Sequence, residues 1–303
     1  MASQNNDSLE YLLRPEILTD ALSIYWPWSK AAPVDWEKVK NLHFGNTGID
    51  ADKMRRVCYP ALKKISVIGL ESMPDLMKFL PLPSAPEFSQ QALGLVILLD
   101  QGPRYLLKEH DARWTSDYFD HIVYAFVSRL LALPAELRPD TAQRWTDAGY
   151  SIDSWAAIRF WFIAPFAHAE IWASQERAMA LTDEVRVVVE RRTATVDPYR
   201  SKRDQNLRDP LAFSRLLSAG PPAGSPKLTM PEWIYWFALV IDVHSPIIAK
   251  FGRYPYRNGA FGRITMAEEE EFLKDTNCFG CIDPESAAKI RKDVLAGRWT
   301  PLK

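Results

Sequence analysis

The spacing of apolar and polar residues predicts helices along most of the chain. In residues 111–133, apolar positions 114, 118, 119, 122, 123, 126, 127, 130 and 131 repeat with the helical period. Residues 15–28 carry a shorter stripe that Pro27 interrupts. Residues 93–99 are apolar on every side, which fits a central helix or a buried strand, and the preceding SQQAL favours a helix over 87–101.

The pattern continues through the second half of the chain. Residues 154–180 predict an aromatic-rich helix with a kink or break at Pro165. The segment VRVVVE (185–190) has strand propensity, although it can equally continue a helix. Residues 196–227 are polar, partly basic and rich in proline and glycine, so they predict an exposed excursion.

Helix boundaries near the C-terminal end follow from capping residues. Residues 230–244 predict a strongly aromatic helix, and Ser245-Pro246 is a typical start for another helix that ends at Gly252. Thr265 with Glu268 predicts a capping box for the next helix. Without a βαβ rhythm or an internal repeat, the pattern predicts an all-α protein.

Composition places few limits on this picture. Net charge is −1, with 47% hydrophobic and 25% charged residues, so no global field favours nucleic acid or a membrane surface. Eleven Trp, eleven Tyr and fourteen Phe indicate an aromatic core, and they also suit a pocket for an apolar ligand. No apolar run approaches the roughly 20 residues of a membrane span, and the start lacks a secretory pattern. With three cysteines too few for a disulfide framework, we expect a cytoplasmic protein.

Several enzyme classes lack their sequence signatures in this chain. It contains no GxGxxG, GxxxxGK[ST], HExxH or GxSxG motif. We therefore expect no cofactor and no metal. The lone CxxC of Cys278 and Cys281 is weak support for zinc or redox chemistry, and we interpret it as incidental.

A cationic segment, HSPIIAKFGRYPYRNGAFGR (244–263), is the strongest candidate for a site. Arg253 and Arg257 can fork onto a carboxylate or phosphate. The structural alternative is that they cap helix ends and pair with Asp100 or Glu170, and for Arg263 we favour a structural role. Pro246 leaves the carbonyl of residue 242 without its helical donor, which predicts a polar pocket wall there.

Two histidines are the best candidates for acid–base chemistry, since histidine titrates near neutral pH. On a continuous helix His168 shares a face with Trp172 and Gln175, while Glu170 points elsewhere. A purely structural pair of hydrogen-bonded histidines, His168 and His244, is an equal alternative. Asp100 and Arg104 would pair along a continued helix, but Gly102-Pro103 predicts that this helix ends or bends there.

Three segments carry a family resemblance: LVILLDQGPR (95–104), FIAPFAHAEIWASQER (162–177) and VHSPIIAKFGRYPYRNGAFGRITMAEEEEFL (243–273). In order and spacing they resemble the helical family known as domain of unknown function 924, whose fold is similar to tetratricopeptide repeats. The family motif positions correspond here to Asp100, Gln101, Arg104, Asp117, His168, Glu170, Gln175, His244, Arg253, Arg257, Asn258 and Arg263. Tyr105, Ala167 and Tyr256 depart from the family pattern, which indicates a diverged member.

The resemblance implies one all-helical, tetratricopeptide-like domain over 1–303. Residues 1–90 would form diverged N-terminal helices, 91–275 the family core and 276–303 a C-terminal tail, with 196–227 as a possible lid. The site would lie between segments 90–104, 162–177 and 240–263. Its candidate catalytic residues are His168, His244, Asp100 and Arg104, and its candidate substrate-binding residues are Gln101, Glu170, Trp172, Gln175, Trp236, Arg253, Tyr256, Arg257 and Asn258.

Three functional hypotheses fit these residues. The first is a cofactor-independent enzyme, an isomerase, cyclase or lyase, that encloses a small, largely apolar molecule between aromatic helices and polarises it by hydrogen bonds. The second is a hydrolase in which a histidine activates water. The third is a helical scaffold that binds a peptide or protein partner, an expectation that rests on fold analogy. For the enzyme we expect a small-molecule substrate and neither nucleic acid nor a membrane as partner.

Overall fold

The computed structural model describes residues 7–45 and 47–303, and within these ranges all regular elements are helical. This confirms the all-α prediction, while a tetratricopeptide-like arrangement stays a prediction. The helices, with η for 3-10 and π turns, are α1 (Leu9–Leu12), α2 (Pro15–Tyr25), α3 (Trp36–His43), α4 (Ala51–Ser66), η1 (Leu70–Ser72), η2 (Leu76–Phe79), α5 (Phe88–Leu106), η3 (Glu109–Asp111), α6 (Ala112–Trp114), η4 (Thr115–Phe119), α7 (Asp120–Leu131), α8 (Ala142–Asp147), α9 (Ile152–Ile158), α10 (Phe160–His168), α11 (Trp172–Thr193), η5 (Arg200–Lys202), α12 (Arg203–Asn206), α13 (Ala212–Ala219), α14 (Met230–Asp242), α15 (Ser245–Phe251), η6 (Pro255–Arg257), α16 (Asn258–Phe261), α17 (Ala267–Asp275) and α18 (Pro284–Leu295).

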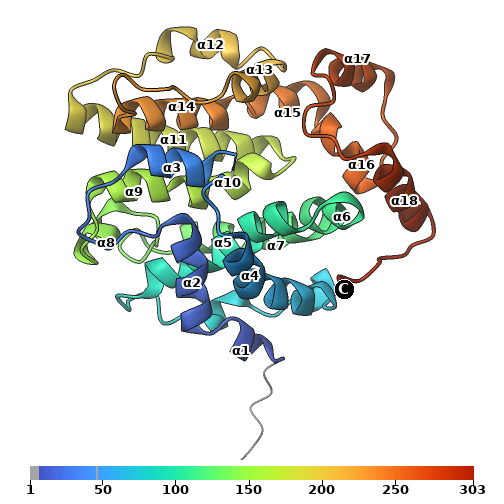
Figure 1. Ribbon diagram of the computed structural model, residues 1–303, viewed down its shortest axis with the longest axis horizontal. Coiled ribbons are helices and arrows are strands. Elements are labelled where there is room, and N and C mark those ends of the chain that lie inside the picture. Colours follow the sequence, from blue (N-terminus) through green and yellow to red (C-terminus); the bar gives the residue numbers. More distant parts are fainter. Residues whose placement is uncertain (1–6, 46) are drawn as a thin grey trace, which may run out of the picture.

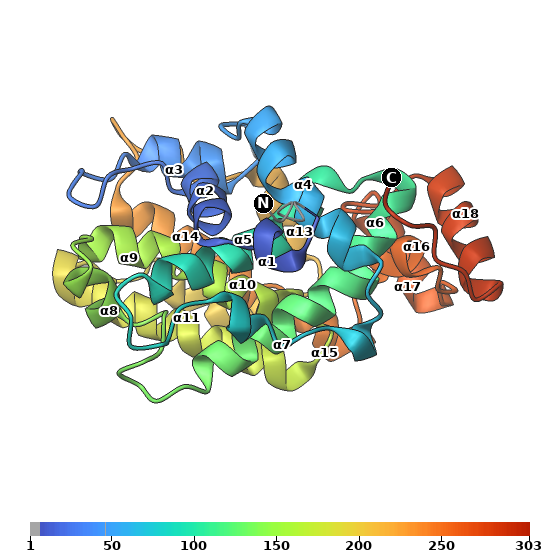
Figure 2. The same cartoon turned by 90° about the horizontal axis from the view of Figure 1, so that it is seen from below.

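Helix α5 is the central element of the bundle, as the apolar run of residues 93–99 predicts. It packs against α2, α4, α7 and α10 (Figures 1 and 2). A Cβ at Gly94 would lie 2.0 Å from the carbonyl oxygen of Leu18, so only glycine allows α2 to approach this closely. The helix does not end at Gly102-Pro103, which was one predicted alternative, because α5 continues through Pro103 to Leu106. The continuation keeps Asp100 and Arg104 one turn apart on the same helix.

The layer formed by α10, α11 and α14 lies beside α5 (Figure 1). The predicted break at Pro165 is wrong in position: α10 runs through Pro165, and the chain leaves the helix at residues 169–171. His168 and Trp172 therefore belong to different helices, so they do not share a face as predicted. The valine-rich segment 185–190 is part of α11 and forms no strand.

Helices α14 and α15 form a nearly continuous apolar rod. Residues 230–251 are long and apolar enough to cross a bilayer by length and composition alone. Of an apolar stretch of 18 residues within this segment, 83% is buried inside the fold. The prediction that no apolar run approaches this length is therefore wrong for residues 230–251. Ser245 lies inside α15, where His244 is the N-cap residue, and its hydroxyl donates to the carbonyl oxygen of Asp242 at 2.8 Å. That carbonyl thus has a donor, contrary to the premise from which a polar pocket wall was predicted there.

The C-terminal helices α16, α17 and α18 lie together at one end of the molecule (Figure 1). α17 begins one residue later than predicted, because Glu269 rather than Glu268 accepts from the N-cap backbone, at Met266. The chain then returns across α6, where Trp114 Nε1 donates to the carbonyl oxygen of Thr300 at 2.9 Å. These contacts hold α18 against η3 and close one side of the region described next.

Candidate functional site

Asp100 on α5 is the centre of a buried polar cluster. Its Oδ1 lies 3.0 Å from His168 Nδ1 and 3.1 Å from Arg104 Nη1, and its Oδ2 accepts from the side-chain amide of Gln101. Burial alone would raise the pKa of this carboxyl, but Arg104, His168 and Gln101 outweigh it and lower the pKa to about 2. Asp100 is therefore ionised at neutral pH although only 1% of its surface is exposed.

A chain of ion pairs extends from this cluster to the cationic segment. Arg104 Nη2 lies 2.8 Å from one oxygen of Asp120, and Arg257 Nη1 lies 3.2 Å from the other. The same Arg257 nitrogen donates to the carbonyl oxygen of His168 at 2.8 Å. Asp120 thus joins α5, α7 and η6, and it brings two guanidinium groups from distant parts of the sequence to one place.

Asp120 follows a π turn, η4, that interrupts the helix predicted over 111–133. π turns insert an extra residue into a helix and are frequent at functional sites. This turn directs Thr115 and Ser116 to the surface of a cavity. Asp120, Thr115 and Ser116 were not predicted as site residues from the sequence. For Asp120, the feature that could have indicated a role is its charge directly beside Phe119 in an apolar stripe.

His168 has the protonation pattern of a general base. An ionised carboxylate can only accept, so Asp100 fixes the proton on Nδ1 and leaves the lone pair on Nε2. Burial and the charge of Arg104 lower the pKa of His168, although Asp100 acts in the opposite direction. Nε2 makes no hydrogen bond within residues 7–45 and 47–303, and 17% of the side chain is exposed.

The ring of His244 lies near that of His168, with ring centroids 6.2 Å apart. Its Nδ1 is 2.7 Å from the carbonyl oxygen of Val240. Burial and the neighbouring His168 lower the pKa of His244 to about 3, so its imidazole is neutral at pH 7. Phe213 of α13 covers it, with ring centroids 4.3 Å apart, and the same ring stacks on Tyr256 at 6.0 Å. Phe213 is thus the residue of segment 196–227 that contacts the cluster, and the lid stays a prediction.

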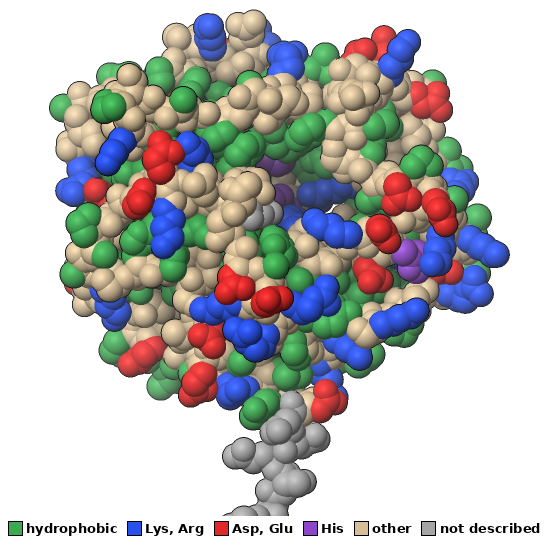
Figure 3. Space-filling model, in the orientation of Figure 1, with side chains coloured by type: hydrophobic (Ala, Val, Ile, Leu, Met, Phe, Trp, Pro, Cys, Tyr) green, Lys and Arg blue, Asp and Glu red, His purple; other side chains and the backbone are tan. Residues whose placement is uncertain are grey.

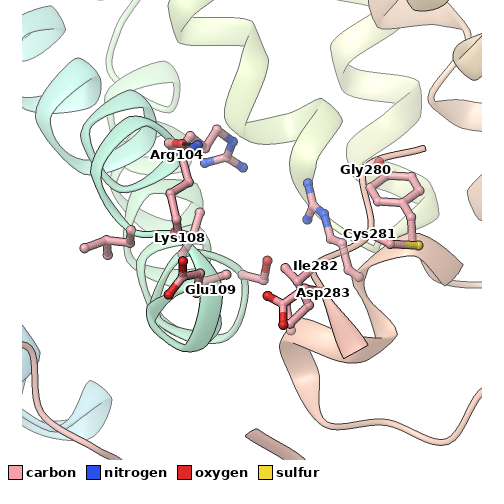
Figure 4. Close-up of a pocket in the computed structure, with 14 residues that line it drawn as sticks. Arg104, Lys108, Glu109, Gly280, Cys281, Ile282 and Asp283 are labelled. Atoms are coloured by element: carbon pink, nitrogen blue, oxygen red, sulfur yellow. Dashed lines mark hydrogen bonds between the residues drawn. The ribbon is translucent and has the colours of Figure 1, made fainter. Parts of the chain in front are cut away.

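Two cavities lie beside this cluster, and Arg257 and Ser116 line both. The larger, of about 370 Å³, lies between α5, η3, η4, η6 and the loop before α18, and Figure 4 shows its lining side chains. The smaller, of about 220 Å³, is lined by residues that include Asp120, His168, Glu170 and Arg263. Figure 3 shows one face of the molecule hollowed near its centre, with histidine and basic side chains visible inside the hollow. Tryptophan lines neither of the two cavities, which differ in this respect from the aromatic enclosure expected from the sequence.

The structure brings most, but not all, of the predicted residues together. Asp100, Gln101, Arg104, His168, His244, Tyr256 and Arg257 lie in or against the cluster. Glu170 lines the smaller cavity, pairs with Arg263 at 2.7 Å and accepts from the amide of Tyr254 at 2.9 Å. Gln175 donates to the Tyr254 hydroxyl and to backbone carbonyls, so it fixes the end of α10.

The remaining predicted residues lie elsewhere. Arg253 and Asn258 both bind the carboxylate of Glu269, which makes them part of the α17 anchor. Trp172 is 47% exposed at the start of α11, and Trp236 is buried against Trp233 in the core. No group of three His, Cys, Asp or Glu side chains suited to a metal occurs in the described part of the chain.

No curated protein and no solved structure matches this chain. A family model does: the one described as "Bacterial protein of unknown function (DUF924)" matches residues 80–277, which is more than half of the sequence. The matched range runs from before α5 to the end of α17 and includes Asp100, Asp120, His168 and Arg257. The chain belongs to the DUF924 family.

Proposed function

We propose that the protein is a cofactor-independent enzyme that transfers a proton on a small organic acid, as an isomerase or a lyase does. The observation that carries this proposal is the pairing of His168 with Asp100 beside two arginines. A neutral imidazole with its lone pair on Nε2 can take a proton from a carbon next to a carbonyl or carboxylate. Asp100 orients the ring and stabilises the imidazolium that forms.

We assign to Arg257 the role of binding the substrate carboxylate. Its Nε and Nη2 make no hydrogen bond within the described residues, while its Nη1 is held by Asp120 and His168. Its guanidinium lies 4.7 Å from the centre of the Tyr254 ring, which restricts its orientation. A planar edge with two free N–H donors matches a carboxylate, and its charge would stabilise the enolate that proton removal creates.

A hydrolase is the second candidate, since Nε2 of His168 can take a proton from water as well as from carbon. The two candidates differ in where the proton comes from, and this difference can be measured. The third hypothesis, a scaffold for a peptide, receives less support because the cavities are compact and have volumes of about 370 and 220 Å³, which suit a small molecule.

The test is deuterium exchange in heavy water. The full chain is incubated with 2-oxobutanoate, levulinate and a simple ester, and loss of the C–H signal is followed by proton NMR. We expect enzyme-dependent exchange on an oxo acid that falls by at least about 100-fold in His168→Gln. His110→Gln, in a histidine that pairs with Asp293 at 3.1 Å, is the matched control and should retain exchange. Ester cleavage without exchange would favour the hydrolase, and exchange that survives His168→Gln would overturn the proposal.

A further inference from the structure

The larger cavity is charged differently at its two ends. Arg104 and Arg257 line one part of it, and Lys108, Glu109 and Asp283 line another, with Glu109 and Asp283 on facing elements in Figure 4. Neither carboxylate has a basic partner within residues 7–45 and 47–303. Asp283 accepts from the amide of Ser286, at 2.8 Å, as the N-cap of α18.

One part of the cavity wall is apolar, and one polar group of the lining has no hydrogen-bond partner among the described residues. Leu107, Ala112, Ala260 and Ile282 line the apolar part. Thr115, which is 9% exposed, also lines the cavity, and its hydroxyl oxygen is buried without a hydrogen-bond partner among the described residues. A buried hydroxyl without a partner is unfavourable, and rotation of the Thr115 side chain towards the cavity would let a bound ligand supply that partner.

We propose that this cavity binds a zwitterion, a carboxylate and an ammonium joined by a short aliphatic chain, as in an amino acid with a terminal amine. The carboxylate binds Arg257 and Arg104, and one of its oxygens accepts from the Thr115 hydroxyl. The aliphatic chain lies along Leu107 and Ile282, and the ammonium lies between Glu109 and Asp283. This inference rests on the proposed function for the position of the carboxylate. Arg257 lines both cavities, so a carboxylate bound to it lies between the larger cavity, which holds the cationic end of the substrate, and the smaller cavity, which His168 lines.

The charges favour this class over a simple acid. A plain carboxylate would satisfy the arginine end but would leave the two negative charges of Glu109 and Asp283 with only the single positive charge of Lys108 beside them. A plain amine would pair with those carboxylates but would place an apolar end against two guanidinium groups. A ligand with both charges satisfies both ends, whereas the apolar wall favours methylene groups between them.

Three probes of similar length separate these possibilities: 6-aminohexanoate, hexanoate and hexylamine. Their affinities for the full chain are measured by NMR titration at low salt. We expect 6-aminohexanoate to bind more tightly than hexanoate, and hexylamine to bind most weakly. Glu109→Gln and Asp283→Asn should each weaken 6-aminohexanoate by about two- to fivefold, as expected for partly exposed ion pairs, and leave hexanoate unchanged. Arg257→Gln should weaken both acids alike.

Asp111→Asn is the matched control, because Asp111 lies on the same turn as Glu109 without lining the cavity. Equal binding of 6-aminohexanoate and hexanoate, with both still dependent on Arg257, would overturn the zwitterion and leave the anion site of the proposed function intact. Binding of neither acid in an Arg257-dependent manner would overturn both. An effect of Asp111→Asn as large as that of Glu109→Gln would show that the selectivity comes from general surface charge and would also overturn the inference.

Discussion

Substitution of Asp100 by asparagine tests the energetic role of the buried cluster. Asp100 has a pKa lowered from 3.8 to about 2. One pKa unit corresponds to about 1.4 kcal/mol, so ionised Asp100 stabilises the folded state by roughly 2 kcal/mol at neutral pH. Asparagine removes this contribution and leaves Arg104 and His168 without their charged acceptor. We expect Asp100→Asn to lower the free energy of unfolding by about 2–4 kcal/mol.

The pH dependence gives this prediction a second signature. Because the folded-state pKa lies below the unfolded one, the stabilisation is complete above pH 3.8 and disappears as the pH falls through about 2. The contribution of Asp100 itself to the difference in unfolding free energy between the parent chain and Asp100→Asn should therefore fall to about half near pH 3. Between pH 7 and 5 the difference should first grow, because Asp100 also raises the pKa of His168 and the variant loses this effect. Urea unfolding, followed by tryptophan fluorescence, measures both quantities.

Asp75→Asn is the control, since Asp75 pairs with Arg129 at 2.6 Å on the surface and both side chains are about half exposed. That substitution should lower the free energy of unfolding by less than about 1 kcal/mol. Equal losses for Asp100→Asn and Asp75→Asn would refute the reasoning, because they would show that the buried position adds nothing to the ion pair. A difference for Asp100→Asn that keeps its full size at pH 3 would refute the assignment of the lowered pKa.

Three further predictions follow from packing and ionisation. Gly94→Ala should destabilise the chain by more than about 2 kcal/mol in urea unfolding, because the added Cβ would meet the Leu18 carbonyl oxygen at 2.0 Å. Gly102→Ala, whose Cβ would lie 3.3 Å from Cys58, should change stability by about 1 kcal/mol or less, and equal effects would contradict the difference in space. At pH 8 iodoacetamide should alkylate Cys281 more slowly than the exposed Cys278, because burial and the neighbouring Cys278 raise the pKa of Cys281 to about 12. Peptide mass spectrometry measures both rates, and faster labelling of Cys281 would disprove this. Phe213→Ala should raise the pKa of His244 from about 3 towards 6.5 in an NMR titration, since the ring that covers it is removed, and an unchanged value would show that α13 does not shield this histidine.

Helix content was predictable because most helices carry a continuous apolar face. The helical period identifies α7 and the fully apolar run identifies α5. Boundaries were less predictable at prolines. Pro165 lacks one backbone donor, but the buried neighbours Phe162 and Phe166 hold α10 together across it. Tertiary packing thus decides where the helix ends, and packing is not visible in a local pattern.

The candidate site was predictable where one helical turn or a shared motif connects its members. Asp100 and Arg104 are such a pair, and the family resemblance adds His168 and Arg257. Asp120 could not be assigned, because the π turn before it changes which residues of this helix face the cavity. The number of aromatic residues also does not show which of them line a pocket. Trp236 faces the core, and a tryptophan in a pocket wall would occupy an equally apolar position in the sequence pattern.

The π turn at residues 115–119 also makes the site sensitive to chain length. Deletion of one residue from η4 would restore a regular α-helix, and each residue before the deletion would rotate by about 100° relative to α7. Thr115 and Ser116 would then leave the cavity while Asp120 stayed in place. A change of helix register, without any change in the chemistry of a side chain, is therefore enough to create or abolish this cavity wall.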